Sequence, residues 1–489
     1  MAKKQHIPHP AWVLQHRKPG TELRLIGGRY YLYEYKTIYD RERKRPKKIS
    51  GKLLGTITEK EGLIPSGKRK LEAALDQKIF SQISCKEYGV SLLIQQKFSD
   101  YEKALQETFG DLWTSIIAIA YCRFVYRCPL KSIPFRLEQS YLPEMLGINA
   151  FNEKSSSHIL KTIGSNPAQM LAYMKCFIHK GEYMLMDVTN VFSNSHQISL
   201  ARKGYNSHLN YEGQFNLLYL YAAHSHMPVY YRLLPGNIRE VKAFKNSLLE
   251  AGLQKAVIIA DKGFYSRKNV ELLQQEQLKF ILPLKRDNVL ISYDALAKNT
   301  FKKGDSFFEH EKRIIWYRKY KADGLSLFLF LDESLRLNED GDYLRRIQTH
   351  PESYSMQEYH IKRNTFGTIA LFTNLTTATA METYQTYKSR MSIEVMFDGM
   401  KNILDADHTY MQDEQTLQGW MFINHITLQW YQQLYIELKE KGLLKTISVN
   451  DYIQILTDVK KIKINGTWHL NEVTSKTQKL IDKTGFSLT

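Results

Sequence analysis

Between residues 182 and 284 the sequence alternates short apolar runs with amphipathic stretches, and this order restricts the possible folds more than any other feature. The runs predict three strands in succession, followed by helix, strand, helix and strand. A meander of three strands followed by this alternation indicates a mixed sheet with helices on its faces, so we predict an α/β core. The predicted elements lie, in order, at 182–186, 215–223, 229–234, 241–253, 255–260, 266–277 and 280–284.

This order of strands and helices is that of the ribonuclease-H-like fold, and the flanking segments have other patterns. Before the core, a Gly27-Gly28 turn joins an apolar strand to the aromatic strand 30–35, which predicts a small β-rich module. A helical region follows, and after the core come a strand-rich insertion and two long helices at 379–403 and 414–440. The predicted domains are a β-rich module (1–75), a helical domain (76–180), a core in two parts (181–286 and 373–440), a β-rich insertion (287–372) and a C-terminal region (441–489).

The charge of the chain indicates its partner. Sixty-eight Lys and Arg against 50 Asp and Glu give a formal net charge of +18. Lys and Arg that neutralise phosphates release condensed counterions, so nucleic acid is the expected partner. An anionic membrane surface is the alternative, which is weakened because no apolar run reaches the ~20 residues of a membrane span. The four cysteines lack zinc-site spacing and the N-terminus lacks a signal-peptide core, so we expect a cytoplasmic protein with oxygen ligands for any metal.

Two aspartates follow predicted apolar strands of the core. Asp187 and Asp261 are 261 − 187 = 74 residues apart. An Asp directly after a buried strand lies at the edge of the sheet where open α/β sheets place their active sites. Such an Asp also often only caps a turn. A third acid on a following helix would favour a metal site, because divalent cations need several converging carboxylates.

The predicted helix 379–403 supplies a third acid, Glu394. Tyr387, Arg390 and Lys401 lie about one or two helical turns from Glu394, so all four side chains share one face of the helix. An ordinary surface ion pair between Arg390 and Glu394 is the alternative. The surrounding apolar residues predict a largely buried helix, which favours a ligand over a surface charge. These apolar residues are Ile393, Val395, Met396, Phe397 and Met400.

The spacing Tyr387-x2-Arg390-x3-Glu394-x6-Lys401 resembles the Tyr-Arg-Glu-Lys signature of the insertion-sequence-four family of DDE transposases. Asp187-Val188-Thr189 resembles the family's Asp-x-Thr, and the residues from Asp261 to Phe264 resemble its Asp-x-Gly-aromatic. The predicted insertion accounts for the long gap of 394 − 261 = 133 residues, as is usual in this family. The resemblance covers about 182 to 440.

The resemblance implies a cut-and-paste DNA transposase of a bacterial-type insertion sequence. It implies that Asp187, Asp261 and Glu394 hold two Mg²⁺ ions, with Mn²⁺ able to substitute, for in-line cleavage of DNA ends and their joining to target DNA. Tyr387, Arg390 and Lys401 would position double-stranded DNA near the cleaved end, and a homodimer would hold two paired ends. The alternatives are a nuclease without strand transfer and a domesticated DNA-binding protein that has lost catalysis.

Further residues are candidates for DNA binding or assembly. The basic stretch beside the aromatic strand predicts contact with the DNA backbone, and a solvated loop is its alternative. Trp316, with Arg313 and Arg318 nearby, is either a residue that stacks on an extruded base or part of the core of the insertion. The apolar helix 414–438 is a candidate dimer interface, with packing against the core as the alternative. The basic stretch comprises Arg43, Lys44, Arg45, Lys47 and Lys48.

Overall fold

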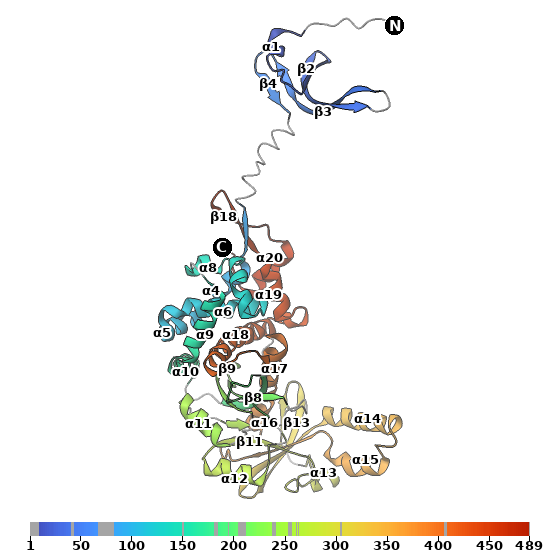
Figure 1. Ribbon diagram of the computed structural model, residues 1–489. Helices are drawn as coiled ribbons and strands as arrows, with labels where there is room; N and C mark the ends of the chain where they lie inside the picture. Colours follow the sequence, from blue (N-terminus) through green and yellow to red (C-terminus); the bar gives the residue numbers. More distant parts are fainter. Residues whose placement is uncertain are drawn as a thin grey trace. The chain divides into compact units, whose positions relative to one another are not determined.

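The computed structural model divides into two compact units, which we describe separately (Figure 1). The smaller unit comprises Met1–Cys85 and Lys461–Leu470, and the larger unit comprises Lys86–Lys460 and Asn471–Thr489. Asp261 and Arg43 lie outside the residues that the structure describes. The described residues are 9–40, 44–66, 83–148, 151–179, 184–193, 195–203, 212–236, 241–252, 257–260, 262, 264–303, 306–404 and 408–488.

The smaller unit contains a four-stranded antiparallel sheet in the order β1–β2–β3–β4. Gly27 and Gly28 form the turn between β1 and β2 with φ values of 57° and 79°, which L side chains rarely adopt, so the predicted hairpin is confirmed. Val13, Leu32, Leu54 and Ile57 form its small core. The elements are α1 (Ala11–Leu14), β1 (Thr21–Ile26), β2 (Arg29–Asp40), β3 (Arg45–Thr58) and β4 (Gly62–Pro65).

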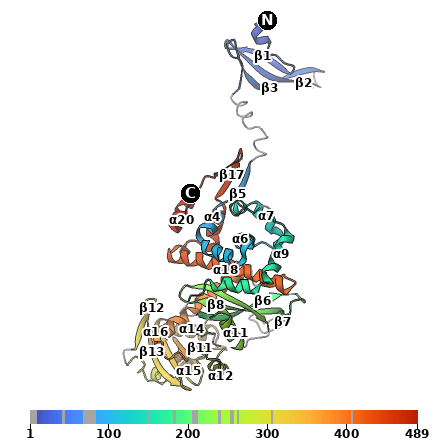
Figure 2. The same cartoon turned by 90° about the vertical axis from the view of Figure 1, so that its left-hand side faces the viewer.

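A helical layer forms the first part of the larger unit, as the apolar spacing predicts. It packs around α18 (Glu414–Glu440), which lies between these helices and the strands β8 and β9 (Figure 2). Gly419 allows α9 to approach closely, because a Cβ there would lie 2.0 Å from the carbonyl oxygen of Leu160. The helices are α4 (Gly89–Lys97), α5 (Ser99–Phe109), α6 (Trp113–Tyr126), α7 (Ile133–Glu138), α8 (Leu142–Leu146), α9 (Glu153–Gly164) and α10 (Pro167–Lys175).

Every residue of α18 from Thr416 to Gln432 except Gln418 is buried, and polar side chains such as Asn424 and Gln429 are buried together with the aromatic and aliphatic ones. Asp413 caps it by accepting a hydrogen bond from the Thr416 amide at 2.9 Å. The aromatic and aliphatic residues that made it a candidate dimer interface are buried within the larger unit, so that hypothesis is wrong. They are Trp420, Phe422, Ile426, Leu428 and Trp430.

The predicted meander is present, with β6 antiparallel to β8 and β8 antiparallel to β9. Strand β10 lies beside β6 and is parallel to β11, and Ser266 caps α12 as predicted. The described residues thus form a mixed α/β arrangement. The elements are β6 (Met184–Ser193), β7 (Arg202–Lys203), β8 (Gly213–Ala222), β9 (Met227–Pro235), α11 (Val241–Ala251), β10 (Val257–Ile259), α12 (Arg267–Gln275), β11 (Lys279–Leu284) and β16 (His408–Thr409).

The segment 287–372, predicted as a β-rich insertion, shares its sheet with the core strands. Strand β15 pairs with β11, and the sheet continues in the order β10–β11–β15–β14–β13–β12. The apolar runs in β14 and β15 are buried on both faces, which requires cover on both sides of the sheet. The elements are α13 (Asp294–Ala297), β12 (Phe307–His310), β13 (Arg313–Ala322), β14 (Leu325–Asp332), α14 (Glu333–Thr349), α15 (Met356–Lys362) and β15 (Thr368–Thr373).

The long helix predicted at 379–403 is interrupted at two places. The Ser389 hydroxyl donates to the carbonyl of Thr386 at 2.7 Å where the first helix ends, and such bonds bend helices. A π-helical turn then follows the second helix. These pieces are α16 (Ala380–Lys388), α17 (Arg390–Asp398) and the turn Gly399–Ile403.

The C-terminal part completes the described structure. Helices α19 (Val449–Thr457) and α20 (Ser475–Thr484) belong to the larger unit. Strands β18 (Thr467–Leu470), β17 (Lys460–Ile464) and β5 (Ser84–Glu87) form a three-stranded sheet in that order. No helix in the described part of the chain is long and apolar enough to cross a membrane.

Candidate active site

Asp187 lies within β6 rather than at its end. The strand continues to Ser193 because residues after Asp187 keep pairing with β8, so the predicted position at the edge of the sheet is wrong. Asp187 is the cross-strand partner of Tyr219, whose ring lies 5.9 Å from that of Phe397 on α17. Side chains of cross-strand partners point to the same face of a sheet, so Asp187 lies on the face that α17 covers.

Arg390, the first residue of α17, joins the acids of two elements. Its Nη2 lies 3.4 Å from Asp187 Oδ2, and its Nη1 lies 2.6 Å from Glu394 Oε1. The pair with Glu394 is the one-turn surface ion pair that the sequence offered as the alternative to a metal ligand. The pair with Asp187 connects the helix to the sheet. The structure therefore brings Asp187, Arg390 and Glu394 together.

The guanidinium is well placed to offset the repulsion between the two carboxylates. The Arg390 and Asp187 side chains are 19% and 20% exposed, so solvent screens this pair only in part. Arg390 Nε is buried and has no hydrogen-bond partner among the described residues. Asp187 Oδ1 accepts a hydrogen bond from the Val188 amide at 2.9 Å, which helps to fix the carboxylate.

Glu394 is more exposed than the sequence predicts. Its side chain is 54% exposed, because Ile393 and Met396 occupy the buried face of α17 and Glu394 points away from them. Val395 is also exposed, so the helix that we predicted to be largely buried is buried on one face only, and Glu394 lies off that face. An exposed acid beside a half-buried aspartate and arginine is accessible to a large substrate at the surface.

Tyr387 and Lys401 lie on either side of this group along the chain. Tyr387 is the last but one residue of α16 and is partly buried against the core. Lys401 lies in the π-helical turn after α17 and is also partly buried. Turns of this kind often occur at functional sites, and this one alters the helical spacing on which the prediction of a shared face depended.

Lys388 is a further charged residue at this end of α16, and the signature does not include it. Burial lowers its pKa, and the positive charges of Arg313 and Lys262 lower the pKa further. Lys262 directly follows Asp261 in the sequence. The sequence could have indicated Lys388 only by its position between Tyr387 and Arg390. Lys388 lies off the helical face that the spacing of the signature residues selects.

The donor set has the chemistry of a site for a hard cation. The described site residues offer carboxylate oxygens, the ligands that Mg²⁺ prefers. No group of three or more His, Cys, Asp or Glu that could hold a metal occurs among the described residues, which do not include Asp261. Two of the three predicted ligands, Asp187 and Glu394, are thus within reach of one guanidinium.

The basic stretch of the smaller unit lies largely on a strand. Lys44, Arg45 and Lys47 are exposed; Lys44 lies in the turn that precedes β3, whereas Arg45 and Lys47 lie on the strand rather than in a loop. Lys48 Nζ lies 3.9 Å from the centre of the Tyr35 ring and 3.2 Å from Glu22 Oε2. These contacts hold Lys48 against the sheet.

Trp316 lies on β13 and is partly buried. The centre of the Trp316 ring lies 5.0 Å from that of Phe307 and 5.6 Å from Lys302 Nζ. Phe307 is half exposed on the edge strand β12. Trp316 therefore belongs to an aromatic and basic surface at this end of the sheet.

One of three comparisons with known proteins identifies a family. The sequence pattern of the family described as the transposase DDE domain matches residues 180–430, more than half of the 489 residues. Among solved structures the chain is similar to a piggyBac transposase, seen by cryo-EM in a synaptic complex with hairpin DNA. The TM-score is 0.36, with 10% sequence identity over 70% of this chain and 69% of that one. No curated protein matches the sequence. The family match, which spans Asp187, Arg390 and Glu394, is the informative one.

Proposed function

The chain belongs to the transposase DDE domain family, and from this membership we propose that it is a cut-and-paste transposase of the insertion-sequence-four type. It would bind the terminal inverted repeats of its element, cleave the DNA ends and join the 3′ ends to target DNA. The contact of Arg390 with both Asp187 and Glu394 is the observation that carries this proposal. This contact supports a common site for two of the three proposed catalytic acids, Asp187 and Glu394.

In this proposal some residues of the site bind the metal ions for cleavage and others position the DNA. Asp187, Asp261 and Glu394 would hold two Mg²⁺ ions, which supply activation of the attacking oxygen and stabilisation of the leaving oxygen. Arg390 presents a planar fork of donors that can hold a phosphate bidentately. Tyr387 and Lys401 would orient the DNA strand beside it.

The DNA-binding surface would extend beyond the site. The basic residues of β3 are proposed to contact the DNA backbone, together with Arg43, which lies outside the described residues. Trp316 is proposed to stack on a base at the DNA end, because its ring lies at a surface beside Lys302. The net charge of +18 disfavours self-association until bound DNA neutralises it, so we propose a homodimer on paired ends.

A nuclease without strand transfer is the second candidate function, and a domesticated DNA-binding protein is the third. The third is disfavoured because two carboxylates converge on Arg390, and a protein without catalysis has no reason to keep such a cluster of like charges. The first two differ only in their products.

The test is to incubate the protein with duplex DNA carrying its element's ends, a supercoiled target plasmid and Mg²⁺, and to map the products. Asp187→Asn, Asp261→Asn and Glu394→Gln are expected to reduce cleavage at least ~100-fold while leaving DNA-end binding largely intact. Asp398→Asn is the matched control, because Asp398 is an exposed acid one turn beyond Glu394.

Three results would decide the proposal. Joined products that depend on Asp187 support transposition. Cleavage that never leads to joining would identify a nuclease. Near-normal cleavage by any of the three acid variants would remove that acid from the site.

A further inference from the structure

The strands β2 and β3 extend beyond the sheet of the smaller unit as a two-stranded ribbon. We call residues 36–40, paired with residues 45–49, the ribbon. Strand β1 pairs with β2 only as far as Glu34, and β4 pairs with β3 only from Gly55 onward, so both edges of the ribbon lack a neighbouring strand within the described residues. A two-stranded ribbon is at best marginally stable in water by itself. Because a ribbon that extends five residues beyond its sheet has little stability by itself, its length suggests that a binding partner covers one of its faces.

The ribbon has two faces of different chemistry. Cross-strand partners share a face, and the pairs alternate between faces along the ribbon. Lys36 pairs with Ile49, Ile38 with Lys47 and Asp40 with Arg45; we call these six residues the isoleucine face. The opposite face, which we call the tyrosine face, consists of Thr37, Tyr39, Pro46 and Lys48.

The isoleucine face combines exposed apolar groups with cations. Ile38 is 48% exposed and Ile49 is 43% exposed. Lys36 and Lys47 are exposed, and neither forms an ion pair within the described part of the chain. On the tyrosine face, by contrast, Tyr35 and Glu22 already engage the ammonium group of Lys48. Only the isoleucine face thus offers cations that nothing on the sheet holds.

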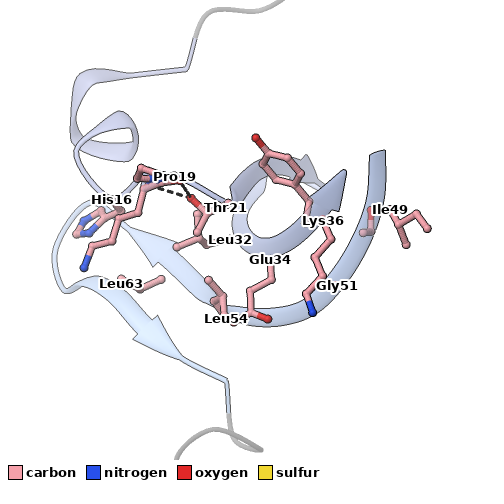
Figure 3. Close-up of a pocket in the computed structure, with 14 residues that line it drawn as sticks. His16, Pro19, Thr21, Leu32, Glu34, Lys36, Ile49, Gly51, Leu54 and Leu63 are labelled. Carbon is pink, nitrogen blue, oxygen red and sulfur yellow. Dashed lines mark hydrogen bonds between the residues drawn. The ribbon is translucent and has the colours of Figure 1, made fainter. Parts of the chain in front are cut away.

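The isoleucine face continues into a pocket of about 590 Å³, shown in Figure 3. Lys36 and Ile49 line the pocket and also belong to the ribbon. Leu32, Leu54 and Leu63 also line it. Its polar side chains include His16, Lys18 and Glu34. Basic groups therefore continue from the isoleucine face into the pocket, and the acids among them are Asp40 on the ribbon and Glu34 in the pocket.

We infer that the ribbon is a sequence-reading element that enters the major groove of duplex DNA with its isoleucine face toward the base edges. The major groove, about 12 Å wide, admits a two-stranded ribbon without distortion and presents a distinct pattern of donors, acceptors and methyl groups for each base pair, whereas the minor groove, about 6 Å wide, mainly distinguishes A·T from G·C. Lysines can donate to guanine O6 and N7, and isoleucine side chains can contact thymine methyl groups, so this face matches the chemistry of base edges. The inference rests on the proposed function in one respect, namely that the partner is DNA.

The experiment uses the full-length protein and a library of duplexes with 20 randomised base pairs. The wild type is expected to enrich a motif, and the double variant Ile38→Ser/Ile49→Ser is expected to lower that enrichment at least 10-fold. Its affinity for a single unselected duplex should stay within about threefold, because the change removes no charge. Lys36→Ala/Lys47→Ala is a second variant, expected to lower the enrichment of guanine at positions of the motif in addition to weakening binding through its two lost charges; unchanged guanine enrichment would overturn the assignment of these lysines to base edges.

The matched control is Leu25→Ser/Ile26→Ser. These two residues are 42% and 51% exposed at the end of β1, outside the ribbon, so the control removes similar apolar surface from the same unit. It is expected to enrich the wild-type motif. Circular dichroism of all variants excludes loss of folding as the cause.

Dimethyl sulfate identifies the groove, because it methylates guanine N7 in the major groove and adenine N3 in the minor groove. Protection of guanine N7 by the wild type, lost in the Ile38→Ser/Ile49→Ser variant, is the expected result. Three outcomes would overturn the inference: an unchanged motif in that variant, no motif for the wild type, or protection of adenine N3 alone.

Metal-dependent cleavage is measured separately and on the same protein. Cleavage that depends on Asp187, together with an unchanged motif in the ribbon variant, would overturn the inference and leave the proposed function standing. Loss of the motif in the ribbon variant without any Asp187-dependent cleavage would support the inference and overturn the proposed function.

Discussion

His425 is completely buried in α18, which packs on the face of the sheet that also carries Asp187. Its ring lies 5.8 Å from that of Tyr219 and 5.1 Å from that of Tyr231, between centres. Neither ring nitrogen has a hydrogen-bond partner within the described residues, and burial lowers the pKa of His425 from 6.5 to about 3. We predict that His425→Leu raises the free energy of unfolding of the larger unit, and that the gain increases at acidic pH.

The size of this gain in the free energy of unfolding follows from the pKa shift of His425 and from its lack of hydrogen-bond partners within the described residues. A buried polar group without a partner costs about 1–3 kcal/mol, which Leu would recover at pH 7.5. Because the folded pKa is depressed, the wild type has the full stability of neutral His425 above pH 6.5 and loses it as the pH falls. At pH 5.0 the difference of 6.5 − 5.0 = 1.5 pH units corresponds to about 2 kcal/mol at about 1.36 kcal/mol per unit, so the gain from Leu should grow by that amount.

Urea unfolding followed by tryptophan fluorescence measures this, because Trp420 and Trp430 are buried in the same helix. Wild type and His425→Leu are compared at pH 7.5 and pH 5.0, and His360→Leu, an exposed histidine of α15, is the control. Other titrating groups are common to both proteins and cancel in the difference. A gain that is the same at both pH values within about 0.5 kcal/mol would refute the reasoning.

Three other predictions concern single residues. Burial raises the pKa of Glu87 from 4.5 to about 7, so the wild type has the stability of the neutral acid below pH 4.5 and loses it as the pH rises through about 7. Glu87→Gln should abolish this pH dependence of the free energy of unfolding, measured by urea. A variant that keeps the same dependence on pH would contradict the prediction. Arg390→Lys should lower cleavage ~100-fold, because one ammonium group cannot replace a guanidinium that contacts two carboxylates, and cleavage within about threefold of wild type would exclude this role. Lys388→Ala should reduce the slope of log affinity for duplex DNA against log salt by about 1, whereas Lys60→Ala, which changes an exposed lysine of the smaller unit, should leave this slope unchanged. An unchanged slope for Lys388→Ala would show that Lys388 makes no phosphate contact.

Local signals in the sequence were sufficient for several elements. The Gly27-Gly28 turn, the cap at Ser266 and the meander of β6, β8 and β9 all follow from neighbouring residues. The contact between Arg390 and Glu394 likewise depends only on helical spacing.

Features that depend on distant residues could not be predicted in this way. The extension of β6 beyond Asp187 depends on pairing with β8, and the pairing of β15 with β11 joins segments far apart in the chain. The break at Ser389 depends on which hydrogen bond one hydroxyl makes, and helical periodicity contains no information about that choice. The ion pair between Arg390 and Asp187 spans 203 residues and appears only when the helix is placed on the sheet.

The position of α18 has a consequence for dissecting the protein. The aromatic rings of this helix pack against residues that precede the family-matched segment: Trp430 stacks on Phe98 at 5.0 Å between ring centres, and Phe422 lies 5.2 Å from Phe109. Helix α18 also continues to Glu440, past the end of the match at residue 430. A fragment cut to the matched residues 180–430 would expose this apolar surface to water and truncate the helix. Such a fragment is expected to aggregate, so the smallest autonomous piece that retains the Asp187 site must begin before α4.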